Sequence, residues 1–281
     1  MKLIAIMAIA IRVRRFFCLH QRGGKGILQQ EKMNMTLRII LCILFGIYLL
    51  YRIYYAIRTK KAKCYSADEL EAVHDHIETR FGTPSFILHE TFSQDIHVDI
   101  AVIPPGNEQN FYTLITMGMG AHLMNVPQED AAARPARAEL LITLPPEWQL
   151  TSESLQDPHW NWPLRWLRTI ATMPYLTNSW LAPAHTFSGD TPEPLSPDTE
   201  LNSFIILHPE ADEQTCEISL PGGEKVCIYQ LYPLYPDELE YAFKHGSAKL
   251  IELIEQQTPN SRVIHPSRAH LTLPLPHQPA E

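Results

Sequence analysis

Several common signatures are missing from this sequence, and each absence excludes a class of protein. The five cysteines are sparse and odd in number, which argues against a disulfide-stabilised scaffold. There is no Gly-Lys-Ser/Thr segment and no Gly-x-Ser-x-Gly segment, so neither a nucleotide-binding P-loop nor a hydrolase nucleophile elbow is indicated. Proline is absent from the start of the chain, because all 23 prolines lie between Pro84 and Pro279.

Acidic residues are also nearly absent from the start of the chain. Residues 1–63 hold 13 Lys+Arg and one acid, Glu31, whereas residues 64–281 hold 10 Lys+Arg and 30 acids. The net charges are therefore +12 and −20, which sum to the −8 of the whole chain. A body of charge −20 is repelled by phosphate backbones, so we expect no nucleic-acid partner. With 45% hydrophobic residues, the chain is also too apolar for a disordered protein.

One long apolar run lies in the basic leader. Residues 39–51 carry no charge, Arg52 interrupts, and the run continues to Ile57. These 19 residues would span about 28 Å as a helix, close to the thickness of a bilayer core. Four tyrosines crowd the end near Arg52, as in the aromatic belts of membrane interfaces. We predict a transmembrane helix over residues 36–58, after an N-terminal extension, residues 1–35, that is not a folded unit.

Two other interpretations of the run stay open, a cleaved signal peptide and a buried soluble helix. No small-x-small cleavage site follows, only a basic linker over residues 59–64, and the run has no polar stripe. Cations are more numerous after the run than before it, which predicts a single-pass protein of the cytoplasmic membrane with its large domain in the cytoplasm. Met33 and Met35 are alternative starts of the chain.

The remaining sequence predicts one α+β domain over residues 65–257. Ser66 and Glu69 form a capping box before a helix that ends near Gly82. A second helix is expected to begin at Pro163, an irregular loop covers residues 182–200, and a third helix covers 237–257. The mixed order of elements favours a mixed β-sheet flanked by helices, followed by a loosely ordered, proline-rich tail over residues 258–281. The expected strands are residues 86–88, 97–103, 111–116, 139–144, 204–207, 216–220 and 225–231.

No reactive constellation in the domain is complete. Gly118 and Gly120 follow a predicted strand, but Leu123 stands where a dinucleotide fingerprint needs glycine, so we interpret both glycines as structural. His97 and Asp99 share one face of a strand, and with His185 they could form the site of a metal-dependent hydrolase. Two ligands with one distant histidine do not define a metal site. We therefore expect no enzyme activity, metal, cofactor or small-molecule substrate.

The tryptophans are the most informative feature. All five lie between Trp148 and Trp180, which predicts a rigid aromatic cluster. Core packing explains most of them, and one or two exposed members would suit a protein-binding surface, where Trp and Arg dominate the energetics. The candidate partner-binding residues are Trp160, Trp162, Arg165, Arg168, Trp180 and His185.

Five segments in this order resemble the Suppressor of fused domain family, in its bacterial branch. They are Phe111–Gly120, Arg137–Trp148, Trp162–Arg168, the stretch from Trp180 to Thr186, and Tyr232–Leu239. One departure is Ala184, where the pattern has glycine before His-Thr. The resemblance implies a mixed sheet flanked by helices and a binding role.

The resemblance also implies what the partner is. Animal relatives restrain transcription factors of the Hedgehog pathway with the help of a second domain, which this chain is too short to contain. Bacterial relatives resemble immunity proteins that neutralise toxins by direct binding. A strongly acidic body would attract a basic toxin by electrostatic steering. We therefore expect a protein partner, which in the most specific form of this hypothesis is a basic toxin. We also expect membrane attachment through the leader.

Overall fold

The computed structural model describes most of the chain, and its residues fall into two units, Met1–Thr59 and Lys60–Glu281. The described residues are 35, 37, 39–51, 62–90, 96–106, 109–129, 135–189, 193–209, 213–258 and 262–274.

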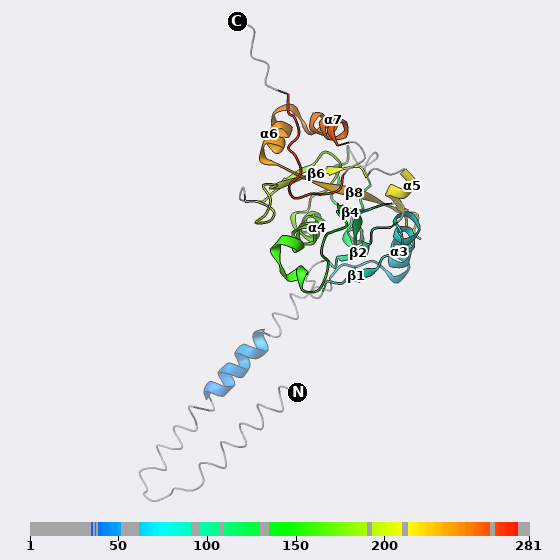
Figure 1. Cartoon of the computed structure of the whole chain (residues 1–281). Coiled ribbons are helices and arrows are strands. Elements are labelled where there is room, and N and C mark those ends of the chain that lie inside the picture. Colours follow the sequence, from blue (N-terminus) through cyan, green and yellow to red (C-terminus); the bar gives the residue numbers. More distant parts are fainter. Residues whose placement is uncertain are drawn as a thin grey trace, which may run out of the picture. The chain divides into compact units, whose positions relative to one another are not determined.

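Within the first unit, residues 39–51 are helical and their large apolar side chains are exposed (Figure 1). Phe45 is 63% exposed and Leu50 is 68% exposed. The other residues of the predicted span, 36, 38 and 52–58, lie outside the described part, as does the extension before Met35. Of the helices that the structure describes, none combines the length and the apolar character needed to cross a membrane.

The second unit is built around one mixed sheet (Figure 1). Its strand order is β1-β2-β3-β4-β8-β6-β5, with β7 paired to the start of β8. All neighbours are antiparallel except β4 and β8, which are parallel. The predicted mixed sheet with flanking helices is confirmed. The strands are β1 (Phe86–Leu88), β2 (Asp99–Ile103), β3 (Tyr112–Met117), β4 (Ala138–Leu144), β5 (Thr186–Ser188), β6 (Ser203–Leu207), β7 (Glu217–Ser219) and β8 (Lys225–Leu234).

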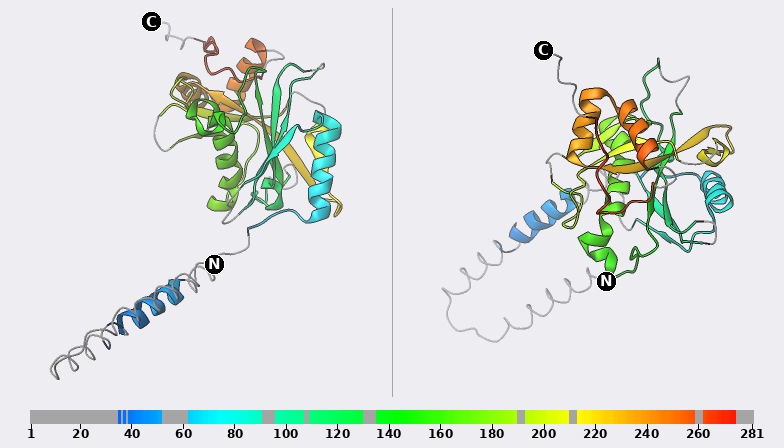
Figure 2. Two further views of the ribbon diagram at one scale, coloured as in Figure 1. Left: turned by 60° about the horizontal axis from the view of Figure 1, so that its bottom comes forward. Right: turned by 45° about the horizontal axis from the view of Figure 1, so that its top comes forward.

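Helices cover both faces of the sheet (Figure 2). One face packs against α4 (Pro158–Thr177) through alternate strand residues such as Leu140, Ile142 and Phe204. The other face packs in two places, against α3 (Ala67–Phe81) and against the pair α6 (Pro236–His245) and α7 (Ser247–Gln257). Short elements η1 (Met119–Ala121), η2 (Ser154–Gln156) and α5 (Glu213–Cys216) lie in the connections. Because side chains alternate along a strand, each central strand supplies apolar residues to both faces.

The structure differs from the sequence-based expectation in three of the expected helices and loops. The second helix begins at Pro158, with Asp157 as its N-cap, so Pro163 lies inside the helix and not at its start. The expected loop over residues 182–200 contains the edge strand β5. The expected helix over 237–257 is two helices, because Gly246 adopts a φ of 93° between them.

The described part of the tail is packed against the domain, contrary to the expected loose order. Ile264 and Leu271 are buried. The main chain of Ile264 donates a hydrogen bond to the Thr143 carbonyl oxygen at 2.9 Å. Arg268 forms a paired hydrogen bond with the fully buried carboxylate of Glu238 on α6. Residues 262–274 therefore belong to the folded domain.

Candidate functional site

The aromatic cluster is organised by the first half of α4. The Asp157 carboxylate caps the helix by accepting a hydrogen bond from the main chain of His159 at 2.9 Å. This start places Trp162 and Trp166 one turn apart, on the side of α4 that faces the sheet. Both lie against Phe204 of β6, with ring centroids 6.4 and 5.6 Å away.

Trp148 connects this cluster to the N-terminal end of α4. Its ring lies edge-on to Trp160 at 5.2 Å and to Trp162 at 6.0 Å, and its indole N–H donates to the Trp160 carbonyl oxygen at 3.0 Å. Trp148 and Trp162 are 4% and 1% exposed, while Trp160 and Trp166 are half-buried. The fully buried rings thus fix the half-buried rings in position, because a packed core leaves aromatic side chains little rotamer freedom.

The two arginines of α4 have different roles. Arg165 lies on the outer side of the helix and is exposed, and its guanidinium donates to the Leu195 carbonyl oxygen at 3.1 Å. Arg168 is half-buried and donates to the carbonyl oxygens of Leu88 and Val98 at 2.8 and 3.4 Å. Burial lowers the pKa of Arg168 below its ordinary value. Arg168 thus ties α4 to β1 and to the residues before β2.

Trp180 and His185 form a separate pair beyond the C-terminal end of α4. Their ring centroids are 4.5 Å apart, and both side chains are half-buried. Trp160 lies in the first turn of α4 and Trp180 follows its last turn, so these two tryptophans lie near opposite ends of a helix about 25–30 Å long. The six candidate residues therefore form no single patch. Trp162 belongs to the core, Arg168 joins two elements, and Trp160, Arg165, Trp180 and His185 reach the surface at different points along α4.

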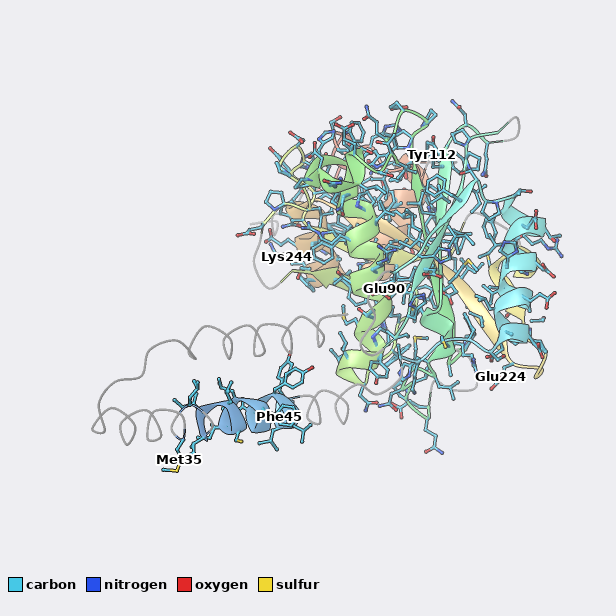
Figure 3. The ribbon with its side chains drawn as sticks, turned by 90° about the horizontal axis from the view of Figure 1, so that it is seen from below. Met35, Phe45, Glu90, Tyr112, Glu224 and Lys244 are labelled. Atoms are coloured by element: carbon cyan, nitrogen blue, oxygen red, sulfur yellow. The ribbon has the colours of Figure 1, made fainter. Side chains whose placement is uncertain are left out.

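The histidines proposed for metal chemistry are not brought together. His97 Nε2 lies 2.9 Å from Asp99 Oδ1, and the other oxygen of Asp99 lies 2.9 Å from His89 Nδ1. Glu90 lies beside α4 next to this group (Figure 3). His185, however, precedes β5, at the sheet edge opposite β1. No group of three or more His, Cys, Asp or Glu residues with metal-binding geometry occurs among the described residues.

A buried carboxylate that the sequence analysis missed organises the other face of the sheet. Glu139 of β4 is completely buried and accepts four hydrogen bonds. The donors are the hydroxyls of Tyr65 and Thr116, at 2.7 and 2.5 Å, and the main-chain N–H groups of Gly118 and Gly120, at 2.9 and 3.0 Å. Burial raises the pKa of Glu139, and the four hydrogen bonds oppose that shift.

This network explains the two glycines. Gly118 has a φ of 140°, and a Cβ atom there would lie 2.0 Å from the His97 carbonyl oxygen. A Cβ atom on Gly120 would lie 2.1 Å from the Tyr65 hydroxyl. The segment is therefore a close-packed turn held by Glu139, as the structural interpretation predicts. A single acid inside an otherwise apolar strand was the signal available in the sequence.

These features define a class of protein, a three-layer α+β domain with rigid, partly exposed aromatic side chains along one helix. The family model described as Suppressor of fused protein (SUFU) matches residues 94–269, more than half of the chain. The chain therefore belongs to the SUFU family, as the resemblance predicts, and the match extends beyond residue 257 into the tail.

Solved structures with related folds include members of the same family. A SUFU homolog from Neisseria gonorrhoeae FA 1090 has a TM-score of 0.52 at 15% identity, covering 75% of this chain and all of that chain. The Sufu–Fu complex gives 0.48 at 17% identity, covering 68% and 86%. Drosophila Suppressor of Fused gives 0.47 at 18% identity, and this chain covers 47% of it. No curated protein matches the chain.

Proposed function

We propose that this chain is a non-catalytic protein-binding module of the SUFU family. The observation that carries the proposal is the α4 side of the domain, where half-buried tryptophans are fixed over buried aromatic rings next to the exposed Arg165. Aromatic residues and arginine are enriched in protein interfaces. A side chain that is already ordered before binding loses little entropy on association.

Within this proposal, the partner is a basic toxin and the chain acts as its immunity protein. The support is electrostatic, because residues 64–281 carry a net charge of −20. Complementary charge accelerates association and suppresses partners of like charge. Binding to another protein has a precedent in the family, since Sufu has been crystallised as a complex with Fu.

The proposal includes a single membrane anchor at residues 36–58 that leaves the large domain in the cytoplasm. The described part of this segment, residues 39–51, is a helix whose large apolar side chains are exposed. Exposed apolar surface of this extent is stabilised by a nonaqueous environment. The surplus of cations after the segment favours the cytoplasmic orientation.

A binding assay with matched charge reversals tests the proposal. The full chain would be titrated with basic candidate toxins chosen from its gene neighbourhood, and growth would be scored when each is expressed together with it. We expect tight binding and rescue of growth. Arg165→Glu should bind about 30-fold more weakly than Lys249→Glu, because it removes a hot-spot side chain that contributes about 2 kcal/mol, whereas both reversals add the same attraction for a basic partner. Lys249→Glu, an equal charge change at an exposed lysine of α7, is the control.

Three results would contradict the proposal. Equal affinities for the two reversals would show that α4 is not part of the binding surface. Absence of both binding and rescue of growth would show that the partner is not the toxin. Stoichiometric zinc or manganese in the purified chain would instead favour the metal-dependent hydrolase.

A further inference from the structure

Two exposed leucines lie at the end of the domain where its described chain begins. Leu123 is 55% exposed and Leu176 is 63% exposed. In the left view of Figure 2, the start of α3 (cyan) and the end of α4 (green) lie at this same end. Exposed leucines are common singly, but these two belong to one contact region.

Three segments that are distant in sequence are fixed together in this region. The rings of His122 and Tyr175 lie edge-on, with centroids 5.1 Å apart. Lys63 Nζ is 3.3 Å from His122 Nδ1 and 5.6 Å from the centre of the Tyr175 ring. We name the surface formed by Lys63, His122, Leu123, Tyr175 and Leu176 the entry face.

The neighbouring main chain holds the entry face rigid. Asn125 donates from its main-chain N–H to the Ser179 carbonyl oxygen at 3.1 Å, and from its side chain to the Asn178 carbonyl oxygen at 3.3 Å. These bonds lock the stretch that carries Leu123 against the C-terminal end of α4, which carries Leu176.

The point where the chain leaves the domain is equally fixed. The Lys63 carbonyl oxygen accepts a hydrogen bond from the main chain of His97 at 2.9 Å, and Lys63 forms a β-bridge with Ile96. Only residues 59–62 separate Lys63 from the end of the proposed anchor. The five Cα–Cα steps from residue 58 to Lys63 span at most about 18 Å when fully extended. A chain anchored in this way keeps Lys63 within that distance of the bilayer surface.

We propose that the entry face binds the surface of the lipid bilayer, with Leu123 and Leu176 in the headgroup–acyl boundary and Lys63 directed to anionic headgroups. This inference rests on the membrane anchor of the proposed function. Exposed leucines beside a tyrosine and a lysine are the composition of interfacial protein surfaces. The acidic remainder of the domain is repelled by an anionic leaflet, which favours contact through this face alone.

Depth-dependent fluorescence quenching tests the inference on the full chain. A fluorescent probe would be attached to Leu123→Cys, Leu176→Cys or Phe243→Cys, in a background with Cys18, Cys42 and Cys64 replaced by serine. Phe243 of α6 is the matched control, because it is 73% exposed and α6 lies at the opposite end of the domain (Figure 2). The chains would be reconstituted in phosphatidylcholine–phosphatidylglycerol vesicles that contain lipids with a quencher in the upper acyl chain.

We expect quenching at positions 123 and 176 to exceed that at 243 severalfold, and to weaken when the phosphatidylglycerol is omitted. A parallel carbonate wash of the vesicles reports the anchor separately. Release of the chain by carbonate would refute the anchor and the inference together. Retention with equal quenching at all three positions would refute the inference alone. Positions 123 and 176 could instead be protected from a water-soluble quencher but not quenched by the lipid quencher. This result would show that the entry face contacts another protein or a second copy of the chain, and it would also refute the inference.

Discussion

Replacement of Glu139 by alanine is the most direct test of how the fold is held together. The variant removes both carboxylate oxygens, Oε1 with its donors Tyr65, Gly118 and Gly120 and Oε2 with its donor Thr116, at distances of 2.5 to 3.0 Å. The four donors would stay in a region that water does not reach, because Glu139 is fully buried in β4. We expect Glu139→Ala to be among the most destabilising single substitutions in the domain.

The magnitude follows from the number of donors left without an acceptor. Each buried polar group that loses its partner costs about 1–3 kcal/mol. Structural relaxation recovers part of this, so we expect a total cost near the lower end of the sum over four donors, about 4 kcal/mol. Glutamine keeps one oxygen for the donors that share Oε1, so Glu139→Gln would cost only about 1 kcal/mol.

Urea unfolding of the three proteins, followed by tryptophan fluorescence, measures these differences. The dependence on pH gives a second, independent signature. Burial raises the pKa of Glu139 above its ordinary value of 4.5, so the folded state holds the proton more tightly than the unfolded state. This contribution to stability is complete below pH 4.5 and is lost as the pH rises through the raised pKa. The decline would be missing in Glu139→Gln, and a wild-type urea midpoint for Glu139→Ala would refute the network.

Three further substitutions test other parts of the structure by the same unfolding assay. Gly120→Ala would place a Cβ atom 2.1 Å from the Tyr65 hydroxyl, and we expect overpacking to lower the free energy of unfolding by about 1–3 kcal/mol. An unchanged free energy of unfolding would show that the turn is not closely packed. Trp162→Ala would remove a ring that is 1% exposed, at a cost of about 3–5 kcal/mol, whereas an unchanged midpoint would place the ring outside the core. Arg268→Ala would leave the Glu238 carboxylate buried without its cation, at a similar cost, and a neutral result would show that the tail is not docked.

Local sequence signals predicted most of the elements. Periodicity and turn residues located β1 to the residue and located β7 and β8 closely; these two strands form a hairpin in which the Gly223 N–H bonds to the Leu220 carbonyl oxygen at 2.9 Å. The capping box at Ser66 also appears as predicted. These features depend on residues that are neighbours in the sequence, which is why the pattern is sufficient to find them.

Features that depend on distant residues were not accessible in the same way. β5 has three residues in a proline-rich stretch, and it is a strand because β6 offers an open edge. The pairing of Arg168 with the carbonyl oxygens of Leu88 and Val98 joins residues up to 80 positions apart. Helical spacing alone places Trp162 and Trp166 on one side of α4, but the partners of that side come from the tertiary fold.

The parallel contact between β4 and β8 sets the order in which the domain is assembled during synthesis. Ala138 is the register partner of Cys227, so the inner edge of β4 stays open until residues 225–234 have been made. An uncovered apolar strand edge is a template for pairing with other chains, and contacts of such long sequence separation form slowly. A nascent chain of this protein therefore passes through an interval in which its half-built sheet needs protection from aggregation, for example by a chaperone.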